Sequence, residues 1–287
     1  MINGETKVFG IIGDPIEHTF SPVMHNAAFK KLDMNNIYVP FNVKAEELED
    51  AISGAYALGI RGLNITIPHK TEVIKYLDYL DIAAGLIGAV NTIEFGKNGI
   101  VGHNTDGIGA VRAINEISSV KNKSIMILGA GGAARAIAFQ ILLSGAKNLI
   151  ISNRTIEKAS ELRDDLIEKL EPDVQIIDLD HDNLKIKLKD TDILINTTPI
   201  GMYPHTNKKP LLTADMMHEN MVVNDIVYNP LKTGLLNEAE KAGAKPISGV
   251  KMLIYQGVES FKIWSGAEPP VEIFKKAIMD HLHLEII

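Results

Sequence analysis

Cysteine is absent from this chain of 287 residues, which excludes disulfides, thiolate metal ligands and a cysteine nucleophile. Aromatic residues make up only 6% of the sequence and are not interleaved with Lys and Arg, so stacking on the bases of a single strand is disfavoured. The chain carries 29 basic and 36 acidic residues, a net charge of −7, with no basic patch to neutralise a phosphate backbone. We therefore expect no nucleic-acid partner.

Long hydrophobic runs are also missing. No window approaches the roughly 20 consecutive apolar residues that a transmembrane helix needs. The start, MINGETKVFGII, has neither the charged n-region nor the long apolar core of a signal peptide. Hydrophobic residues nonetheless make up 46% of the chain and charged residues 23%, as is usual for a globular protein. We therefore expect a cytoplasmic protein with no membrane partner.

The first half of the chain alternates short apolar runs with segments of helical periodicity. Residues 7–12, 36–43 and 61–67 predict strands, and the segments PVMHNAAFKKL and AEELEDAISGAYALG between them predict helices. This alternation indicates a parallel α/β sheet. Two further strand-like pieces flank residues 96–99, which predicts a hairpin.

A second α/β series begins near residue 104. The segment SIMILGAGGAARAIAFQILLSGAKNLIISNRT predicts a strand, a glycine turn, a helix and another strand. DILINTTP and MVVNDIVYNP predict additional strands, and helical periodicity returns after Gly249. The whole chain is therefore predicted to be of the α/β class, in two α/β halves.

The glycine turn of the second half fits the dinucleotide-binding fingerprint G-x-G-x-x-G/A. Gly129, Gly131 and Ala134 occupy its three fixed positions, after the apolar run 125–128 and before a helix. The glycines let backbone amides approach a pyrophosphate at the positive end of that helix. The alternative is a turn whose glycines serve only the close packing of helix on strand. We favour the dinucleotide interpretation because the strand and the helix that the fingerprint requires are both present.

The end of the next strand indicates which dinucleotide binds. An NAD enzyme is expected to have an Asp or Glu there, bonded to the ribose 2′-hydroxyl, but residues 152–155 read SNRT. Arg154 offers a planar cation to a 2′-phosphate, and Lys158 lies one helical turn further on. In the alternative interpretation Arg154 is a surface charge, and Thr155 is a helix N-cap in either case. The missing acid and the present base together predict NADP.

Polar residues in the first half stand where a plain sheet protein would not need them. Ser21 follows the first strand, Asn64 and Thr66 share one face of the predicted third strand, and Lys70 follows its end. Ligands of open parallel sheets bind beyond the carboxyl ends of strands, where such side chains can converge. Ser21 could cap a helix, with or without binding a ligand, and Lys70 could be a surface lysine. Asn64 and Thr66 could be satisfied polar groups of the core.

Further polar residues and three histidines extend this region. Asn91 and Thr92 lie in the next strand-like segment, and residues 104–106, NTD, close the half. His18, His25 and His69 have no metal-ligand spacing and no paired carboxylates around them. We interpret these histidines as helix-start and loop residues and expect no metal.

Nine segments, in this order and over essentially the whole chain, closely resemble the shikimate dehydrogenase family. Those of the first half are GDPI with HTFSP within 13–22, NITIPHK at 64–70, GAVNT at 88–92 and GHNTDG at 102–107. Those of the second half are GAGGAAR at 129–135, NRT at 153–155, NTTPIGM at 196–202, DIVYNP at 225–230 and GVKMLIYQ at 249–256. Any one of them is a modest signal, whereas nine in the right order are highly specific.

The resemblance implies two domains separated by a cleft. Residues 1–103 and 245–287 would form the substrate-binding catalytic domain, and residues 104–244 the Rossmann domain that binds NADP. The implied activity is the reversible, NADP-dependent reduction of 3-dehydroshikimate to shikimate in aromatic amino acid biosynthesis. The implied partners are these small molecules, with the protein a monomer or a homodimer.

The resemblance also assigns residues. Lys70 and Asp106 would form the catalytic pair. The substrate would be held by these two and by Thr19, Ser21, Asn64, Thr66, Asn91, Thr105, Tyr228 and Gln256. NADP would be held by Gly129, Ala130, Gly131, Gly132, Ala133, Asn153, Arg154, Thr155, Lys158, Thr197, Met202, Ile226, Gly249 and Met252. Hydride reduction of a ketone leaves a developing alkoxide that needs a proton. We assign the proton transfer to Lys70, and to Asp106 the orientation of the hydroxyl and of Lys70.

One residue departs from the family pattern, and alternatives remain. The family usually has Ser-x-Ser in its first loop, where Thr19 here keeps the hydroxyl and adds a methyl group. A quinate/shikimate dehydrogenase of broader specificity is one alternative, although such enzymes often prefer NAD and Arg154 argues against that cofactor. A non-catalytic NADP-binding sensor is another, but Lys70 and Asp106 are both present. A folate-type dehydrogenase shares the architecture without explaining the nine segments.

Overall fold

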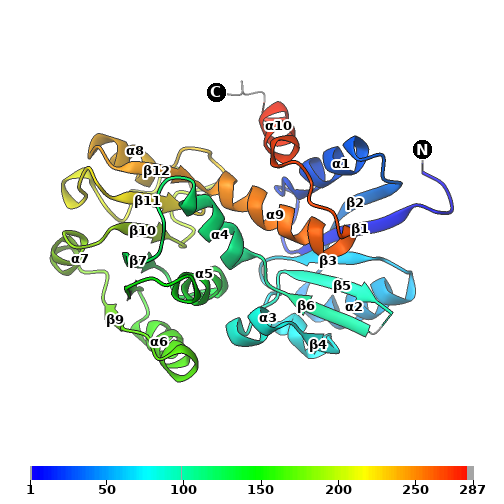
Figure 1. The fold of residues 1–287 in the computed structure, drawn as a ribbon, viewed down its shortest axis with the longest axis horizontal. Coiled ribbons are helices and arrows are strands. Elements are labelled where there is room, and N and C mark those ends of the chain that lie inside the picture. The colour runs from blue at the N-terminus through cyan, green and yellow to red at the C-terminus, as the bar shows by residue number, and fades with distance from the viewer. Residues whose placement is uncertain (1, 98, 283–287) are drawn as a thin grey trace. The chain divides into compact units, whose positions relative to one another are not determined.

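The computed structural model describes residues 2–97 and 99–282. The chain forms two compact units, each with its own sheet (Figure 1). The first unit comprises Met1–Thr105 and Ile254–Ile287, and the second comprises Asp106–Leu253. The resemblance implied that the chain returns to the first domain at residue 245. The return to the first unit lies later in the structure, because residues 245–248 form a strand of the second unit's sheet.

The sheet of the first unit is mixed, with strand order β2-β1-β3-β5-β6-β4. Its strands are β1 (Lys7–Gly13), β2 (Asn36–Asn42), β3 (Gly62–Ile65), β4 (Tyr79–Leu80), β5 (Thr92–Gly96) and β6 (Gly99–His103). The first three strands pair in parallel, as predicted, and β5 and β6 form the predicted antiparallel hairpin. Asn98 of that hairpin lies outside the described residues.

The predicted third strand is shorter than its apolar alternation suggested. Strand β3 ends at Ile65, so Thr66 belongs to the turn that follows, and the Ile67 side chain is 69% exposed. Asn64, by contrast, is a buried residue of the strand. The two residues therefore do not share one strand face.

Helices of the first unit pack on this sheet around an aromatic and aliphatic core. They are α1 (Ser21–Lys31), α2 (Leu48–Ala57), α3 (Ile82–Ile87), α10 (Val271–His281) and most of α9 (Gly249–Ser265). Helices α1 and α10 contact each other, although nearly the whole chain separates them (Figure 1). The packing of α9 on β3 requires glycine at position 62, because a Cβ there would collide with the indole of Trp264 on α9.

The sheet of the second unit is entirely parallel, with strand order β12-β11-β10-β7-β8-β9. Its strands are β7 (Ser124–Leu128), β8 (Asn148–Ser152), β9 (Val174–Ile177), β10 (Ile193–Asn196), β11 (Val222–Asp225) and β12 (Lys245–Ser248). This is the Rossmann order, which reverses between the first strand, β7, and the fourth, β10. Ligands of such sheets bind outside the carboxyl ends of the strands at that reversal.

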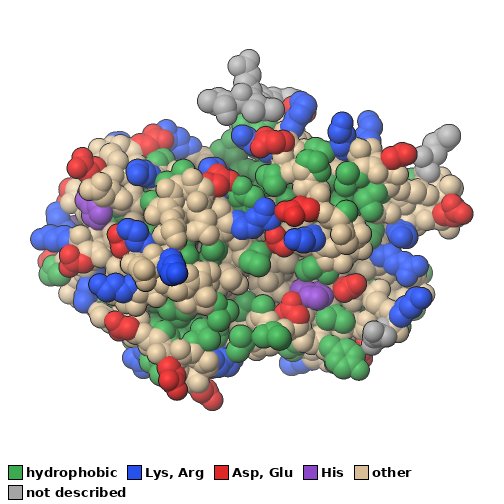
Figure 2. Space-filling view, viewed as in Figure 1, with side chains coloured by type: hydrophobic (Ala, Val, Ile, Leu, Met, Phe, Trp, Pro, Cys, Tyr) green, Lys and Arg blue, Asp and Glu red, His purple; other side chains and the backbone are tan. Residues whose placement is uncertain are grey.

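The central strands of this sheet are buried along almost their whole length, as parallel sheets require. The helices that connect them are α4 (Asp106–Asn115), α5 (Gly132–Leu143), α6 (Ile156–Leu170), α7 (His181–Leu188) and α8 (Gly234–Lys241). Among the described residues no helix is long and apolar enough to cross a membrane. On the face drawn in Figure 2, Lys and Arg side chains alternate with Asp and Glu side chains.

Candidate functional site

A buried cluster of polar side chains lies in the first unit, where β2, β3 and β5 meet helix α9. The hydroxyl of Tyr38 donates to Asn64 Oδ1 at 2.7 Å, which fixes the orientation of the Asn64 amide. Asn64 Nδ2 then faces the backbone oxygen of Asn91 at 3.1 Å and Thr92 Oγ1 at 3.0 Å. All hydrogen-bonding partners of the Asn64 amide named here belong to the protein. This environment agrees with the alternative in which Asn64 is a satisfied polar group of the core.

Asn91, Thr105 and Gln256, three of the predicted substrate residues, belong to the same cluster. Asn91 Nδ2 donates to Thr105 Oγ1 at 2.9 Å and to Gln256 Oε1 at 3.4 Å. Asn91 Oδ1 accepts from the Thr105 backbone N–H at 2.8 Å. The structure thus brings these three residues and Asn64 together, although they come from four separate segments of the chain.

Two members of the cluster, Tyr38 and Ser260, were not predicted from the sequence. Tyr38 sits within β2, where a large aromatic residue is ordinary in a strand, so no sequence signal singles it out. Ser260 follows Gln256 by four residues on α9 and so lies on the same helix face. That spacing is the signal by which Ser260 could have been found.

The first loop brings Ser21 to Tyr38. Phe20, not Ser21, occupies the N-cap position of α1, so the capping interpretation of Ser21 is wrong. Ser21 is buried and its side chain is hydrogen-bonded to Tyr38. Burial raises the pKa of Tyr38 well above its usual value of 10.0, so its hydroxyl stays protonated. Thr19 is half-buried and accepts a bond from the Ser21 backbone N–H at 3.3 Å.

Lys70 lies in the turn after β3, which several hydrogen bonds hold in place. The ring of His69 is buried and bonds to the Val43 carbonyl through Nε2 at 2.7 Å. The carbonyl of Lys70 accepts from the Val90 N–H at 2.8 Å, and that of Thr66 from the His69 N–H at 2.9 Å. Lys70 and Thr66 are both half-buried.

Asp106 is the first residue of α4 in the second unit, and its side chain is buried. A carboxylate at this end of a helix is stabilised by the helix dipole. Gly107, which follows it, packs so closely on α5 that a Cβ there would collide with the Ala136 carbonyl and the Gln140 side chain. Close packing of α4 on α5 therefore fixes the position of Asp106 within its unit.

The glycine turn connects β7 to α5. Gly129 has φ of +110°, and a Cβ there would collide with Thr197 Oγ1, so the fold itself requires this glycine. Gly131 and Gly132 differ, because a Cβ at either would meet no atom within 4 Å, and φ at Gly131 is −88°. The packing-only interpretation of the turn therefore explains Gly129 but neither Gly131 nor Gly132.

The end of β8 lies beside this turn, since the Gly129 N–H donates to the Ser152 carbonyl at 2.8 Å. Arg154 and Lys158 follow, and both are exposed, with no hydrogen bond or ion pair to any residue that the structure describes. Arg135 of α5, by contrast, pairs with Asp165. Thr155 is the N-cap residue of α6, as predicted, but its side chain makes no capping bond.

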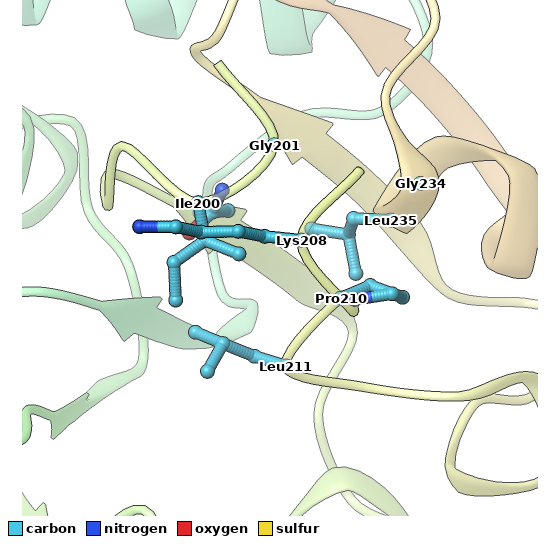
Figure 3. Close-up of a pocket in the computed structure, with 8 residues that line it drawn as sticks. Ile200, Gly201, Lys208, Pro210, Leu211, Gly234 and Leu235 are labelled. Carbon is cyan, nitrogen blue, oxygen red and sulfur yellow. The ribbon is translucent and has the colours of Figure 1, made fainter. Parts of the chain in front are cut away.

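A buried carboxylate, Asp225, organises the loops after β10 and β11. It accepts from Asn196 Nδ2 at 2.9 Å and from Thr233 Oγ1 at 2.6 Å, and burial raises its pKa. These bonds hold the segment that continues into Thr197 and the pocket shown in Figure 3. The pocket is lined by Asn196, Ile200, Gly201, Lys208, Pro210, Leu211, Gly234 and Leu235, and it was not predicted from the sequence.

The remaining predicted residues of the second unit lie after its strands, except Met252, which lies within α9. Thr197 Oγ1 donates to the Leu128 carbonyl at 2.7 Å, next to the glycine turn. Gly249 opens α9, where a Cβ would collide with the Ile226 carbonyl, so its lack of a side chain has a packing cause. Burial raises the pKa of the half-buried Tyr228, while Met202 is 42% exposed and Met252 is buried.

His25 is an interior residue of α1 and not the helix-start residue that the sequence suggested. Its ring is fully buried and stacks on Tyr38 with centroids 4.4 Å apart, and neither ring nitrogen has a hydrogen-bond partner among the described residues. Burial lowers the pKa of His25 from 6.5 to about 3. The folded protein therefore keeps this ring neutral at pH values where the unfolded chain protonates it.

Acid should consequently destabilise the fold through His25. Below pH 6.5 the unfolded chain binds a proton that the folded protein does not, so the free energy of unfolding falls by up to about 1.4 kcal/mol per pH unit. The loss should reach about 2 kcal/mol at pH 5. Urea unfolding at pH 7 and pH 5 should show that His25→Phe removes this part of the difference. The exposed His205→Gln should keep it. An identical difference in His25→Phe and wild type would contradict the assignment.

A sheet in Rossmann order with a glycine turn at its reversal point, together with a second α/β unit that carries a buried polar cluster, defines a two-unit dinucleotide-binding dehydrogenase. Family models place the chain more closely. The substrate binding domain of shikimate dehydrogenase matches residues 11–93, shikimate / quinate 5-dehydrogenase matches residues 112–227, and the shikimate 5′-dehydrogenase C-terminal domain matches residues 249–279. The chain belongs to the shikimate dehydrogenase family.

Individual relatives match the chain over nearly its full length. Shikimate dehydrogenase (NADP(+)) of Methanocaldococcus jannaschii is 53% identical over 98% of this chain and 99% of its own. A crystal structure of shikimate dehydrogenase in complex with NADP+ superposes with a TM-score of 0.93, at 53% identity, over 98% of this chain and 97% of that one. Shikimate 5-dehydrogenase of Listeria monocytogenes, in complex with shikimate and NAD, gives 0.91 at 39% identity over 96% and 98%. The predicted family and fold class are confirmed.

Proposed function

We propose that this protein is an NADP-dependent shikimate dehydrogenase that reversibly reduces 3-dehydroshikimate to shikimate. The observation that carries the proposal is the match to curated NADP(+) shikimate dehydrogenases at about half identity, including 53% identity over 98% of the chain. Three family models together extend the match from residue 11 to residue 279. On this proposal the first unit binds the substrate and the second binds NADP.

The second unit fits an NADP molecule at the carboxyl ends of β7 and β8. Gly131 and Gly132 are glycines for which neither packing nor backbone conformation gives a reason, and close approach of a pyrophosphate supplies one. Arg154 and Lys158 are exposed cations without partners among the described residues, next to that turn. A 2′-phosphate would accept charge-assisted hydrogen bonds from both.

Lys70 and Asp106 are the proposed catalytic residues. Bound NADPH would supply the hydride that reduces the ketone carbon. The Lys70 ammonium then gives a proton to the developing alkoxide and stabilises its charge, and in the reverse direction the same amine accepts the hydroxyl proton. Asp106, held at the start of α4 by the packing of Gly107 on α5, orients the hydroxyl and Lys70.

The buried cluster of the first unit supplies the proposed contacts to the substrate hydroxyls. Asn91, Thr105 and Gln256 are already oriented by bonds to one another, which lowers the entropic cost of binding. Thr19 and Ser21 of the first loop are the proposed partners of the substrate carboxylate, and Tyr228 of the second unit is a further substrate residue. Thr66, half-buried in the turn before Lys70, completes the set.

A steady-state assay of the pure protein with shikimate and quinate, each with NADP and NAD, tests the function. We expect kcat/KM for shikimate to exceed that for quinate by about tenfold or more. Quinate carries an extra hydroxyl on a tetrahedral carbon, which costs ~1–3 kcal/mol if it is left unpaired. Thr19→Ser should narrow the difference in kcat/KM between shikimate and quinate, because it removes the Thr19 methyl group that takes up space near the substrate carboxylate. Thr6→Ser, in an exposed turn, is the control.

The outcomes of this assay separate the alternatives. Equal turnover of quinate by the wild type would favour the dehydrogenase of broader specificity. Binding of NADP without turnover of either acid would favour the non-catalytic sensor. An unchanged substrate ratio in Thr19→Ser would remove the role of the methyl group and leave the function intact. The proposal also includes that the protein is cytoplasmic, is a monomer or a homodimer, and has no nucleic-acid partner. Sedimentation would measure its oligomeric state.

A further inference from the structure

Ser260 is a fully buried residue of α9 whose hydroxyl meets three members of the polar cluster. Asn64 Nδ2 donates to Ser260 Oγ at 3.0 Å, and Ser260 Oγ lies 2.8 Å from Thr92 Oγ1 and 3.2 Å from Thr105 Oγ1. Ser260 Oγ also donates to the backbone carbonyl of Gln256 at 3.0 Å. One hydroxyl on α9 is thereby bonded to β3, to β5 and to the segment that precedes α4.

Two of the hydroxyls next to Ser260, those of Thr92 and Thr105, are also hydrogen-bonded to the Asn91 amide. Thr92 Oγ1 donates to Asn91 Oδ1 at 3.0 Å, and Thr105 Oγ1 accepts from Asn91 Nδ2 at 2.9 Å. Both threonine hydroxyls are in turn within hydrogen-bond distance of Ser260 Oγ. Through the two threonines, the Ser260 hydroxyl therefore helps to set the orientation of the Asn91 amide, to which Gln256 is bonded.

We propose that Ser260 is a positioning residue of the substrate site, one that sets the orientation of Asn91, Thr105 and Gln256 without touching the substrate. This inference rests on the proposed function, in which these three residues bind the substrate hydroxyls. The buried side chain of Ser260 acts through its neighbours. Its removal should weaken the binding of the cyclohexene acid and leave the binding of the dinucleotide unchanged.

The fold should survive loss of this hydroxyl, because each of its three side-chain partners keeps another bond. Asn64 Nδ2 retains the Asn91 carbonyl, Thr92 Oγ1 retains Asn91 Oδ1, and Thr105 Oγ1 retains Asn91 Nδ2. None of these three side chains is left without a partner. A lost hydrogen bond is costly mainly when it leaves a buried polar group unpaired. An effect on KM can therefore be measured on folded protein.

Ser260→Ala and Ser260→Cys, assayed with shikimate and NADP, test the proposal. A thiol fills the volume of the hydroxyl but is a weak hydrogen-bonding group, so both variants should raise the KM for shikimate by about five- to tenfold. The KM for NADP should stay at the wild-type value in both. Ser265→Ala is the matched control, because Ser265 on the same helix also bonds to the carbonyl four residues before it, Phe261 O at 2.7 Å, and its hydroxyl forms no hydrogen bond to a member of the cluster.

Each other outcome has a distinct meaning. A normal KM for shikimate in Ser260→Cys with a raised one in Ser260→Ala would identify a cavity effect and overturn the proposal. Equal increases in both KM values, or loss of folding of both variants by circular dichroism, would show a general structural role and also overturn it. Unchanged kinetics in both variants would overturn the inference alone. Absence of shikimate turnover by the wild type would overturn the proposed function and the inference with it.

Discussion

Lys70→Ala is expected to lower kcat by about 100-fold or more, the usual scale for loss of a general acid–base group, with a smaller change in the KM for shikimate. The developing alkoxide would lose both its proton source and its countercharge. The alanine variant should fold normally, because the turn around Lys70 is held by backbone bonds to Val90 and by the buried ring of His69. Steady-state rates at saturating shikimate and NADP measure the effect.

Lys75→Ala is the matched control for this experiment. Lys75 lies a few residues further along the same segment, pairs with Glu72 and has a side chain that is 66% exposed, so its loss should leave kcat unchanged. A Lys70→Ala protein that kept most of its kcat would remove Lys70 from the mechanism. The proton would then have to come from another group, and Asp106→Asn measured in parallel would show whether the carboxyl supplies it.

The architecture of the second unit could be predicted well because its strands carry an unambiguous pattern. Strands β7, β8 and β10 are buried on both faces and so appear as continuous apolar runs. Two strands escaped prediction, β9 and β12, and both are edge strands. Only Val174 is buried in β9 and only Ile247 in β12, so neither sequence shows such a run. The domain boundary that the resemblance implied, at residue 245, precedes β12 instead of following it.

The end of β3 shows a different limit of the sequence pattern. Alternation of apolar and polar residues continues to Ile67, but the Ile67 side chain is exposed in the turn. The alternation of residue types does not show where the hydrogen bonds between neighbouring strands end. Thr66 and Lys70 were nevertheless correctly placed near the carboxyl end of the strand, because a shift of two residues does not move them away from it.

Candidate site residues were predictable where a motif carries them, whereas residues that act through contacts were not. Asn64, Asn91 and Gln256 lie in segments typical of the family, and the structure brings them together. Ser260 bonds to Asn64 across 196 positions of sequence, so no local pattern predicts that contact, and only the spacing of Ser260 from Gln256 on α9 points to it. His25 has the sequence position of an ordinary helix residue, and only the fold shows that aromatic rings surround it.

Arg154→Ala is expected to raise the KM for NADP by about ten- to a hundredfold, since a charge-assisted contact contributes roughly 1.5–3 kcal/mol. NAD has no 2′-phosphate, so its KM should change little and the preference of the enzyme for NADP should shrink. The structure supports this assignment because Arg154 has no partner among the described residues and follows the strand whose end bonds to the glycine turn. Initial rates with each cofactor at saturating shikimate give the ratio.

Arg163→Ala separates a specific contact from a general loss of positive charge. Arg163 lies on α6, the helix that follows Arg154, and pairs with Asp164, so its removal should leave the KM for NADP unchanged. Lys158→Ala should have a smaller effect than Arg154→Ala, because an ammonium cannot form the two parallel bonds that a guanidinium offers a phosphate. If the wild type used NAD as well as NADP, the interpretation of Arg154 would be wrong. Equal effects of Arg154→Ala and Arg163→Ala would show that charge alone, without a direct contact, attracts the cofactor.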